Sequence, residues 1–258
     1  MKAVITALKT LGFQDVRDVD AEKEAAGDTG PRREDIHLMD AAVPVLIEVK
    51  GITGTPKEAS ALQVAKYLAP RMREWKRTDL RGLAIVNHQR HIPALDREHD
   101  HVFQNDVIVN AEEQGFGVMT TWDLHRLVRA YHARDWRHED VRELFVTAGR
   151  VRPVPTHYDY LGTIDGFWEQ ASALGLRVEE GTVSEGDRVA YELPVDFIEE
   201  DVTSLRLNDT DVAKAAAGTY IGLKTTLTKA QARKGIRVYR VAQESAPEGS
   251  SPPDASGA

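Results

Sequence analysis

An apolar run that ends in charged residues constrains the fold of this chain more than any other stretch. The sequence Val-Pro-Val-Leu-Ile at 43–47 is typical of a buried strand, yet no turn residue follows it. The chain continues directly into Glu48, Val49 and Lys50. Because side chains alternate between the two faces of a strand, Glu48 and Lys50 point to the same side. A carboxylate and an ammonium group therefore meet at the end of a core strand, either as a surface ion pair or as part of a polar site.

Strands and helices alternate on both sides of this run. Gly12 ends an amphipathic helix that starts near residue 1, and a charge-rich loop is predicted over 18–33. This order of elements predicts an α/β sandwich around a mixed central sheet. The other predicted elements are strands at 35–39, 43–50, 80–87 and 116–122, and helices at 56–68 (resuming after Pro70), 106–115 and 121–135.

The pattern of apolar residues, prolines and glycines changes near Arg150. The segment 151–157 contains two prolines and is predicted to be a linker. Short apolar runs separated by glycines then follow without a helical period, which predicts a small all-β barrel. The last residues are rich in Pro, Gly and Ser and are predicted to be disordered. The predicted organisation is a domain at 1–150, a linker at 151–157, a barrel at 158–245 and a tail at 246–258.

Composition excludes several classes of protein. The 258 residues are 41% hydrophobic and 29% charged, as in a globular protein. No cysteine is present, which excludes disulfides, thiolate metal sites and cysteine nucleophiles. No apolar run approaches the roughly 18 residues of a membrane helix, and the N-terminal segment lacks the features of a secretory signal. We therefore expect a cytoplasmic protein without a membrane partner. The net charge of −8 argues against an extensive nucleic-acid coat but not against a local basic groove.

The charged pair gains a neighbour if the two strands form a hairpin. Asp35 begins the strand before the apolar run, and hairpin pairing brings it beside Glu48. Two carboxylates at one sheet end offer the hard oxygen ligands that suit Mg²⁺ or Mn²⁺. Lys50 beside them is placed to orient a water molecule and to stabilise charge that develops on a phosphate. These residue types predict a metal-dependent site for phosphodiester chemistry, with the surface ion pair as the alternative.

The order of these residues resembles the PD-(D/E)XK nucleases, which have the restriction-endonuclease-like fold. The resemblance covers roughly residues 1–130 and rests on Asp35 followed by a strand that ends in Glu48-Val49-Lys50. It implies a divalent-metal-dependent nuclease in which Asp35 and Glu48 hold Mg²⁺ or Mn²⁺ together with the carbonyl of Val49. It also implies that Lys50 positions the attacking water. By the habit of the family, DNA is favoured over RNA as the substrate.

A second motif extends the same resemblance. Gln63 and Tyr67 are four residues apart in the next predicted helix and so share one helical face. They look like the QxxxY motif of RecB-like members, which implies that they support the substrate and the site. The sequence departs from the PD-(D/E)XK pattern at two places. The residue before Asp35 is Glu34 and not Pro, and the first helix carries no acid where many members place a Glu.

The C-terminal half resembles the second domain of elongation factor Tu. The likeness covers about 158–242 and includes Gly162, the turn from Gly181 to Asp187 and the sequence Gly-Leu-Lys at 222–224. It implies a translation-factor-type barrel that binds nucleic acid or a partner protein and does not catalyse. No Gly-x-x-x-x-Gly-Lys-Ser/Thr motif is present, so the chain is not a GTPase of that motif.

Several other residues admit both a functional and a structural interpretation. Four histidines at 88, 91, 99 and 101 have spacings that occur in zinc sites, although loop hydrogen bonding is the alternative. Asn87 and His88 follow a predicted strand at the edge where ligands gather in α/β sheets, and either contact substrate or order the loop. Asp123 lies in the first turn of a helix whose N-cap is Thr120 or Thr121, which indicates a structural role.

Two basic clusters are candidate nucleic-acid contacts, and the alternative for each is a solvated surface. If the acids serve only the fold, the chain is instead a non-catalytic nucleic-acid-binding or protein-binding module, or the tail of a larger protein. A homodimer is compatible with either reading. The candidate contacts are Lys66, Arg71, Arg73, Lys76 and Arg77 in the first cluster and Lys229, Arg233 and Lys234 in the second.

Overall fold

The computed structural model describes residues 1–31, 33–56 and 63–242. The chain divides into two compact units, one up to Thr156 and one from His157 on. The predicted disordered tail at 246–258 lies outside the described residues, as do residues 57–62 of the helix predicted at 56–68.

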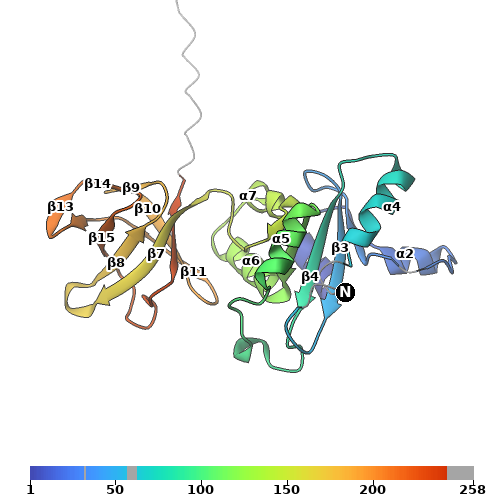
Figure 1. The fold of residues 1–258 in the computed structure, drawn as a ribbon, viewed down its shortest axis with the longest axis horizontal. Coiled ribbons are helices and arrows are strands. Elements are labelled where there is room, and N and C mark those ends of the chain that lie inside the picture. Colours follow the sequence, from blue (N-terminus) through green and yellow to red (C-terminus); the bar gives the residue numbers. More distant parts are fainter. Residues whose placement is uncertain (32, 57–62, 243–258) are drawn as a thin grey trace, which may run out of the picture. The chain divides into compact units, whose positions relative to one another are not determined.

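A mixed sheet forms the centre of the first unit (Figure 1). The described strands lie in the order in which they occur along the chain, from β1 to β6. The pairs β1–β2 and β2–β3 are antiparallel, whereas β3–β4, β4–β5 and β5–β6 are parallel. This confirms the predicted α/β class with a mixed sheet. The strands are β1 (Val16–Asp18), β2 (Ile36–Leu38), β3 (Val45–Gly51), β4 (Arg81–Asn87), β5 (Phe116–Thr120) and β6 (Gly149–Arg150).

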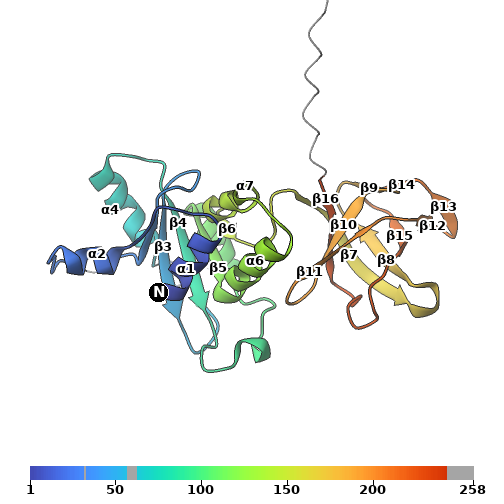
Figure 2. The ribbon, with the colours of Figure 1, turned by 180° about the vertical axis from the view of Figure 1, so that it is seen from behind.

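Helices cover both faces of this sheet. One face carries α4 (Ala65–Trp75) and α5 (Asn105–Glu113), whose apolar residues share a core with Leu46, Ala84 and Phe116 of the strands. The other face carries α1 (Lys2–Thr10) and α6 (Thr121–Ala133), which lie in front of the sheet in Figure 2. Thr120 caps α6 in a capping box with Asp123, as predicted for Asp123. Two shorter helices, α2 (Val19–Ala25) and α7 (His138–Arg142), complete the described α-helices of this unit.

The charge-rich segment after the first helix is more ordered than the sequence predicted. The expected loop at 18–33 contains α2 (Val19–Ala25), and β1 precedes it. Asp18 is the reason the helix begins there, because its side chain accepts a hydrogen bond of 3.1 Å from the main-chain N–H of Ala21. The prediction failed because a helix of two turns has too few apolar positions to show a period.

The helix after β3 also differs from its prediction. The sequence predicted a break at Pro70, but α4 continues through Pro70 to Trp75. A proline inside a helix removes one main-chain hydrogen bond. Leu68 and Arg71 are buried on either side of Pro70, so packing of this turn against the sheet outweighs that loss. The helix ends at Lys76, which adopts a left-handed conformation with φ of 52°.

The second unit is all-β and antiparallel, which confirms the predicted class of this half. Its larger sheet has the order β11-β10-β16-β7-β8-β15-β12-β13, and a smaller sheet pairs β14 with β9. Both sheets contribute to one apolar core, which includes Val183 of β9 and Ala215 of β14. The strands are β7 (Tyr158–Trp168), β8 (Ala173–Val178), β9 (Thr182–Ser184), β10 (Arg188–Glu192), β11 (Phe197–Asp201), β12 (Leu205–Leu207), β13 (Thr210–Val212), β14 (Lys214–Ala216), β15 (Tyr220–Lys224) and β16 (Arg237–Val241).

Glycine is required where two strands of this unit approach closely. A Cβ atom at Gly162 would lie 1.8 Å from the carbonyl oxygen of Arg177, so no larger residue fits without movement of the main chain. The predicted turn after β9 is present, and Asp187 holds it by accepting a hydrogen bond of 2.8 Å from the N–H of Ser184. None of the helices in the described residues has the length and apolar character needed to cross a membrane.

The segment predicted as a linker is packed against the first unit over most of its length. Val151 is buried and its N–H donates to the carbonyl of Val118 on β5 at 3.0 Å. Thr156 donates in the same way to the carbonyl of Asp140 at 2.9 Å. Pro153 and Pro155 are also buried. The prolines thus end a packed segment of the first unit and are not evidence of an exposed connector.

Candidate active site

Two carboxylates meet where β2 begins and β3 approaches its end. Ile36 of β2 pairs with Ile47 of β3, so Asp35 and Glu48 are the next residues outward from this pair. A hydrogen bond of 2.7 Å from the N–H of Val49 to Oδ2 of Asp35 fixes the Asp35 side chain against β3. The hairpin therefore brings Asp35 beside the Glu48-Val49-Lys50 segment. The buried start of β3 anchors the arrangement, because Val45, Leu46 and Ile47 are fully enclosed.

Glu48 is the more buried carboxylate of the pair, and its surroundings disfavour its negative charge. Only 5% of its surface is exposed, and its Oε2 atom is buried without a hydrogen-bond partner among the described residues. Burial and the neighbouring charge of Asp35 raise the pKa of Glu48 to about 7, although Lys50 acts in the opposite direction. Burial also raises the pKa of Asp35, against the lowering effect of the Val49 hydrogen bond. A positive charge at this point would relieve the repulsion.

Lys50 leads from the carboxylates to the next helix. Its positive charge lowers the pKa of both Asp35 and Glu48. Its ammonium group donates a hydrogen bond of 2.6 Å to Oε1 of Gln63, and Nε2 of Gln63 donates to the hydroxyl of Tyr67 at 3.3 Å. Gln63 and Tyr67, which the sequence placed on one helical face, are thereby connected to the charged pair.

A third carboxylate, Glu34, precedes Asp35 in the chain and is bound by His37 and Arg71. Its Oε1 atom is 2.6 Å from Nε2 of His37 and accepts a hydrogen bond of 2.6 Å from Nε of Arg71. Burial alone would raise the pKa of Glu34, but these two partners lower it below its usual value. Glu34 thus remains a buried anion that links the start of β2 to α4. The PD-(D/E)XK motif that the sequence resembles has Pro at this position, whereas Glu34 here forms an internal ion pair.

Sequence reasoning missed an acid that acts on the site from a different helix. Asp20, in the first turn of α2, raises the pKa of both Asp35 and Glu48. The resemblance implies an acid on the first helix, which has none in this chain. The available signal was the Asp18 cap, since it marks the start of the helix that carries Asp20.

The site offers few ligands to a divalent cation. In residues 1–31, 33–56 and 63–242, no three His, Cys, Asp or Glu side chains converge as a metal-holding group. The remaining donors are the two carboxylates and the main chain. The N–H of Val49 points toward Asp35, and in a strand the carbonyl of the same residue points to the same side. Mg²⁺ commonly uses one or two carboxylates and keeps several water ligands, so this donor set fits such an ion.

The histidine-rich loop after β4 is held by its own hydrogen bonds. His88 is buried, with Nε2 2.9 Å from the carbonyl of Glu98, and His99 stacks on Trp122 with a centroid distance of 4.3 Å. Asn87 accepts a hydrogen bond of 2.6 Å from Arg97. These contacts favour the loop-ordering interpretation of Asn87 and His88 over contact with substrate. They also give no support to the zinc alternative.

The basic residues predicted to contact nucleic acid differ in exposure and in ion pairing. Arg71 is only 8% exposed and binds Glu34 and Glu74, so its assignment to nucleic-acid contact is corrected to an internal ion pair. Arg77 is paired with Asp79 through two hydrogen bonds. In the second unit the fold brings acids to a stretch that has none in sequence, because Lys234 lies 2.6 Å from Asp165 and Lys229 lies 3.9 Å from Glu169. The exposed members are Lys66, Arg73, Lys76, Lys229, Arg233 and Lys234.

No protein-family model and no curated protein sequence matches this chain. The chain resembles the C-terminal domain of a candidate U32 peptidase from Geobacillus thermoleovorans, with 10% identity and a TM-score of 0.29 over 32% of this chain and 91% of that domain. A bacterial selenocysteine-specific elongation factor is similar at 14% identity and a TM-score of 0.29, over 92% of this chain and 42% of the factor. Elongation factor SelB from Methanococcus maripaludis gives 12% identity and a TM-score of 0.27, over 76% and 41%. Similarity at this level carries no argument about function.

Proposed function

We propose that the first unit is a divalent-metal-dependent nuclease. The observation that carries the proposal is the buried Glu48, whose Oε2 has no hydrogen-bond partner in the described part of the chain and lies in a site shared with Asp35 and the charge of Lys50. Two repelling carboxylates at a strand end destabilise a protein unless a cation joins them. Asp35, Glu48 and the carbonyl of Val49 would hold Mg²⁺ or Mn²⁺.

The residues around the pair have separate roles in hydrolysis. When bound, the cation supplies a charge that holds the phosphodiester and lowers the pKa of a bound water. Lys50 orients that water and stabilises the negative charge that develops on the phosphate oxygens. Gln63 holds the Lys50 ammonium group in place through the 2.6 Å hydrogen bond, and Tyr67 supports Gln63. Asp35 is fixed by the N–H of Val49, so it does not have to reorganise when the cation binds.

The substrate class follows from the resemblance to PD-(D/E)XK nucleases, which favours DNA over RNA. The second unit, through its resemblance to a translation-factor barrel, would bind nucleic acid or a protein partner. Exposed Lys229, Arg233 and Lys234 are its candidate contacts, although Lys234 is partly neutralised by Asp165.

A cleavage assay with a matched control variant tests the proposal. The substrates are single-stranded DNA, double-stranded DNA and RNA, each with Mn²⁺ and with chelator. The Lys50→Met variant keeps the apolar stem and removes the charge, so we expect cleavage to fall at least ~100-fold while the fold is retained. Lys9→Met is the control, because Lys9 is exposed on α1, on the opposite face of the sheet. Unchanged cleavage by Lys50→Met would mean that the activity comes from another site.

A non-catalytic binding module is the second candidate. It is favoured by the absence of a third converging side-chain ligand in the part of the chain that the structure describes. In that case the parent protein binds nucleic acid or a partner but cleaves none of the three substrates with Mn²⁺ present.

A further inference from the structure

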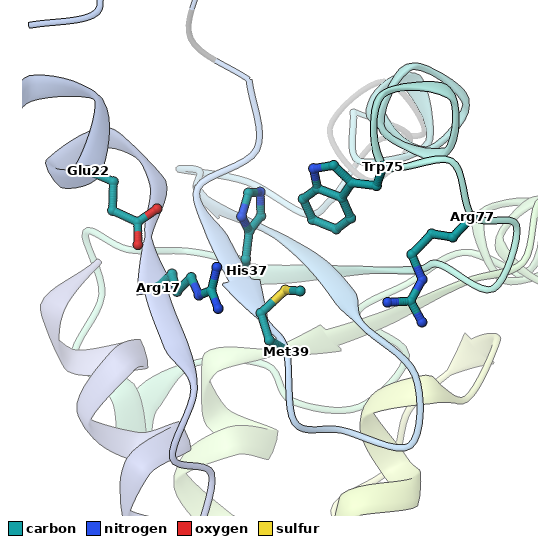
Figure 3. Close-up of a pocket in the computed structure, with 6 residues that line it drawn as sticks. All are labelled: Arg17, Glu22, His37, Met39, Trp75 and Arg77. Carbon is teal, nitrogen blue, oxygen red and sulfur yellow. The ribbon is translucent and has the colours of Figure 1, made fainter. Parts of the chain in front are cut away.

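A pocket of about 420 Å³ opens beside the candidate active site (Figure 3). Its walls combine two guanidinium groups, an imidazole, an indole, a thioether and one carboxylate. Nothing in the proposed cleavage site uses it. The lining residues are Arg17, Glu22, His37, Met39, Trp75 and Arg77.

The pocket lies on the same face of the sheet as the carboxylates. His37 and Asp35 are two residues apart at the start of β2, so their side chains share one face and their main chains are separated by ~7 Å. Glu34 connects the two places, since it precedes Asp35 and its Oε1 lies 2.6 Å from His37. The rise along one strand of a duplex is about 3.4 Å per nucleotide, so the ~7 Å between these main chains corresponds to about two stacked nucleotides.

The two arginines are held ready for an anion. Arg17 pairs with Asp15, and Arg77 pairs with Asp79, in each case through Nε and Nη2 at 2.5–2.7 Å. A guanidinium group has five N–H donors in a rigid plane, so Nη1 of each arginine lies outside these pairs. Figure 3 shows the two guanidinium groups on opposite sides of Met39. The aspartates therefore fix the orientation of both groups and leave donors for a phosphate.

The apolar part of the pocket can accommodate an unstacked base. Trp75 is only partly buried; its ring lies 4.9 Å from the His37 ring in an edge-on contact, and the Arg71 guanidinium sits over the indole at 5.7 Å. These contacts immobilise the indole, so little side-chain entropy is lost when a base packs on its exposed surface. Aromatic side chains bind bases of any sequence, with about 1–3 kcal/mol for each base.

We infer that this pocket binds one unpaired nucleotide of the substrate strand, next to the phosphate that is cut. The inference rests on the proposed nuclease function and names its substrate class: single-stranded nucleic acid, or duplex with a frayed end. The base contacts Trp75 and Met39, and the phosphate contacts Nη1 of Arg77. Glu22 lies near Arg17 and adds a negative charge to that side of the pocket, so we place the phosphate at Arg77.

Binding is measured without metal, so that cleavage cannot contribute. The probe is a fluorescein-labelled oligothymidylate of about 12 nucleotides, used with chelator and followed by fluorescence anisotropy over a range of salt concentrations. We expect Trp75→Ala to weaken binding ~10-fold or more, and Arg77→Gln to reduce the salt slope by about 0.7. A blunt duplex of the same length should bind more weakly than the single strand. Arg129→Gln, on the exposed side of α6, is the matched control and should change neither quantity.

The outcomes separate this inference from the nuclease proposal. Thermal unfolding checks that each variant is folded, and Trp75→Leu, which keeps apolar bulk but has no aromatic ring, replaces Trp75→Ala if that variant is unstable. Equal binding by the parent, the Trp75 variant and Arg77→Gln would overturn the pocket inference even if the parent cleaves DNA. Absence of oligothymidylate binding by the parent would overturn it as well. Loss of binding in the pocket variants, with no cleavage by the parent, would support the pocket and refute the nuclease.

Discussion

At the scale of the single residue, Glu48 explains why a charged pair ends a core strand. An isolated ion pair at the surface would hold both groups in water, whereas Glu48 is 95% covered and its charge is opposed by Asp35. Lys50 lies on the same face of the strand as Glu48, and its ammonium group is hydrogen-bonded to Gln63. Groups with such shifted pKa values cluster at functional sites, so this arrangement supports the proposal of a cation at this point.

Replacement of Glu48 should therefore stabilise the metal-free protein at high pH. The pKa of Glu48 is raised from 4.5 to about 7 in the folded state, so the folded state binds more protons than the unfolded state between these values. Stability then falls as pH rises through this window, by roughly 3 kcal/mol at most. In chelator, Glu48→Gln should be more stable than the parent at pH 8, and the difference should vanish near pH 4. Urea unfolding at several pH values measures it, and a difference that is independent of pH would contradict the account.

At the scale of the element, β2 and α4 are joined by the buried pair of Glu34 and Arg71. Arg71→Met leaves the Glu34 carboxylate buried with His37 as its remaining described partner, and we expect a loss of about 3–5 kcal/mol. The double variant with Glu34→Gln should recover much of this loss. Arg33→Met is the control, since Arg33 and Glu74 form an exposed pair worth less than about 1 kcal/mol. Similar urea midpoints for Arg71→Met and Arg33→Met would show that the buried pair does not join the two elements.

The elements that sequence reasoning predicted correctly have strong periodic patterns. The apolar runs of β3, β4 and β5 and the amphipathic period of α6 are visible without a structure. One of the missed elements is α2, where local capping by Asp18 decides the structure and no pattern repeats. The continuous passage of α4 through Pro70 was also missed, because burial of Leu68 and Arg71 is a tertiary effect.

For the site, the sequence placed Asp35, Glu48 and Lys50 near one another through strand alternation and the hairpin. It could not reveal that Glu34 is paired with Arg71, which is distant in sequence, or that Asp20 acts on both carboxylates. Such contacts depend on how α2 and α4 pack, and a single sequence contains no periodic signal for that. The roles of the site residues remain predictions.

At the scale of the whole molecule, each unit has an apolar core of its own. The core that includes Leu46, Ala84 and Phe116 belongs entirely to the first unit, and the core that includes Tyr191 and Leu223 belongs entirely to the second. The sequence suggested a linker at 151–157, but burial of Val151 assigns that segment to the first unit. Proline content alone did not distinguish a packed segment from an exposed one.

Separate cores predict that the two units fold independently. Residues 1–156 and 157–242, expressed separately, should each unfold cooperatively, with melting temperatures within a few degrees of those in the full chain. The first fragment should keep any metal-dependent cleavage, with weaker substrate binding if the second unit contributes contacts. Differential scanning calorimetry measures both transitions, and a fragment without a cooperative transition would show that the units depend on one another.

The central claim is that Asp35 and Glu48 share a divalent cation. Its most direct test is an anomalous difference map from crystals grown or soaked with Mn²⁺. The account predicts a peak at about 2.0–2.3 Å from one carboxylate oxygen of each residue, with the Val49 carbonyl as a third ligand, and no peak in an Asp35→Asn, Glu48→Gln variant. A map with no peak between the two carboxylates, from a protein that cleaves DNA with Mn²⁺, would contradict it.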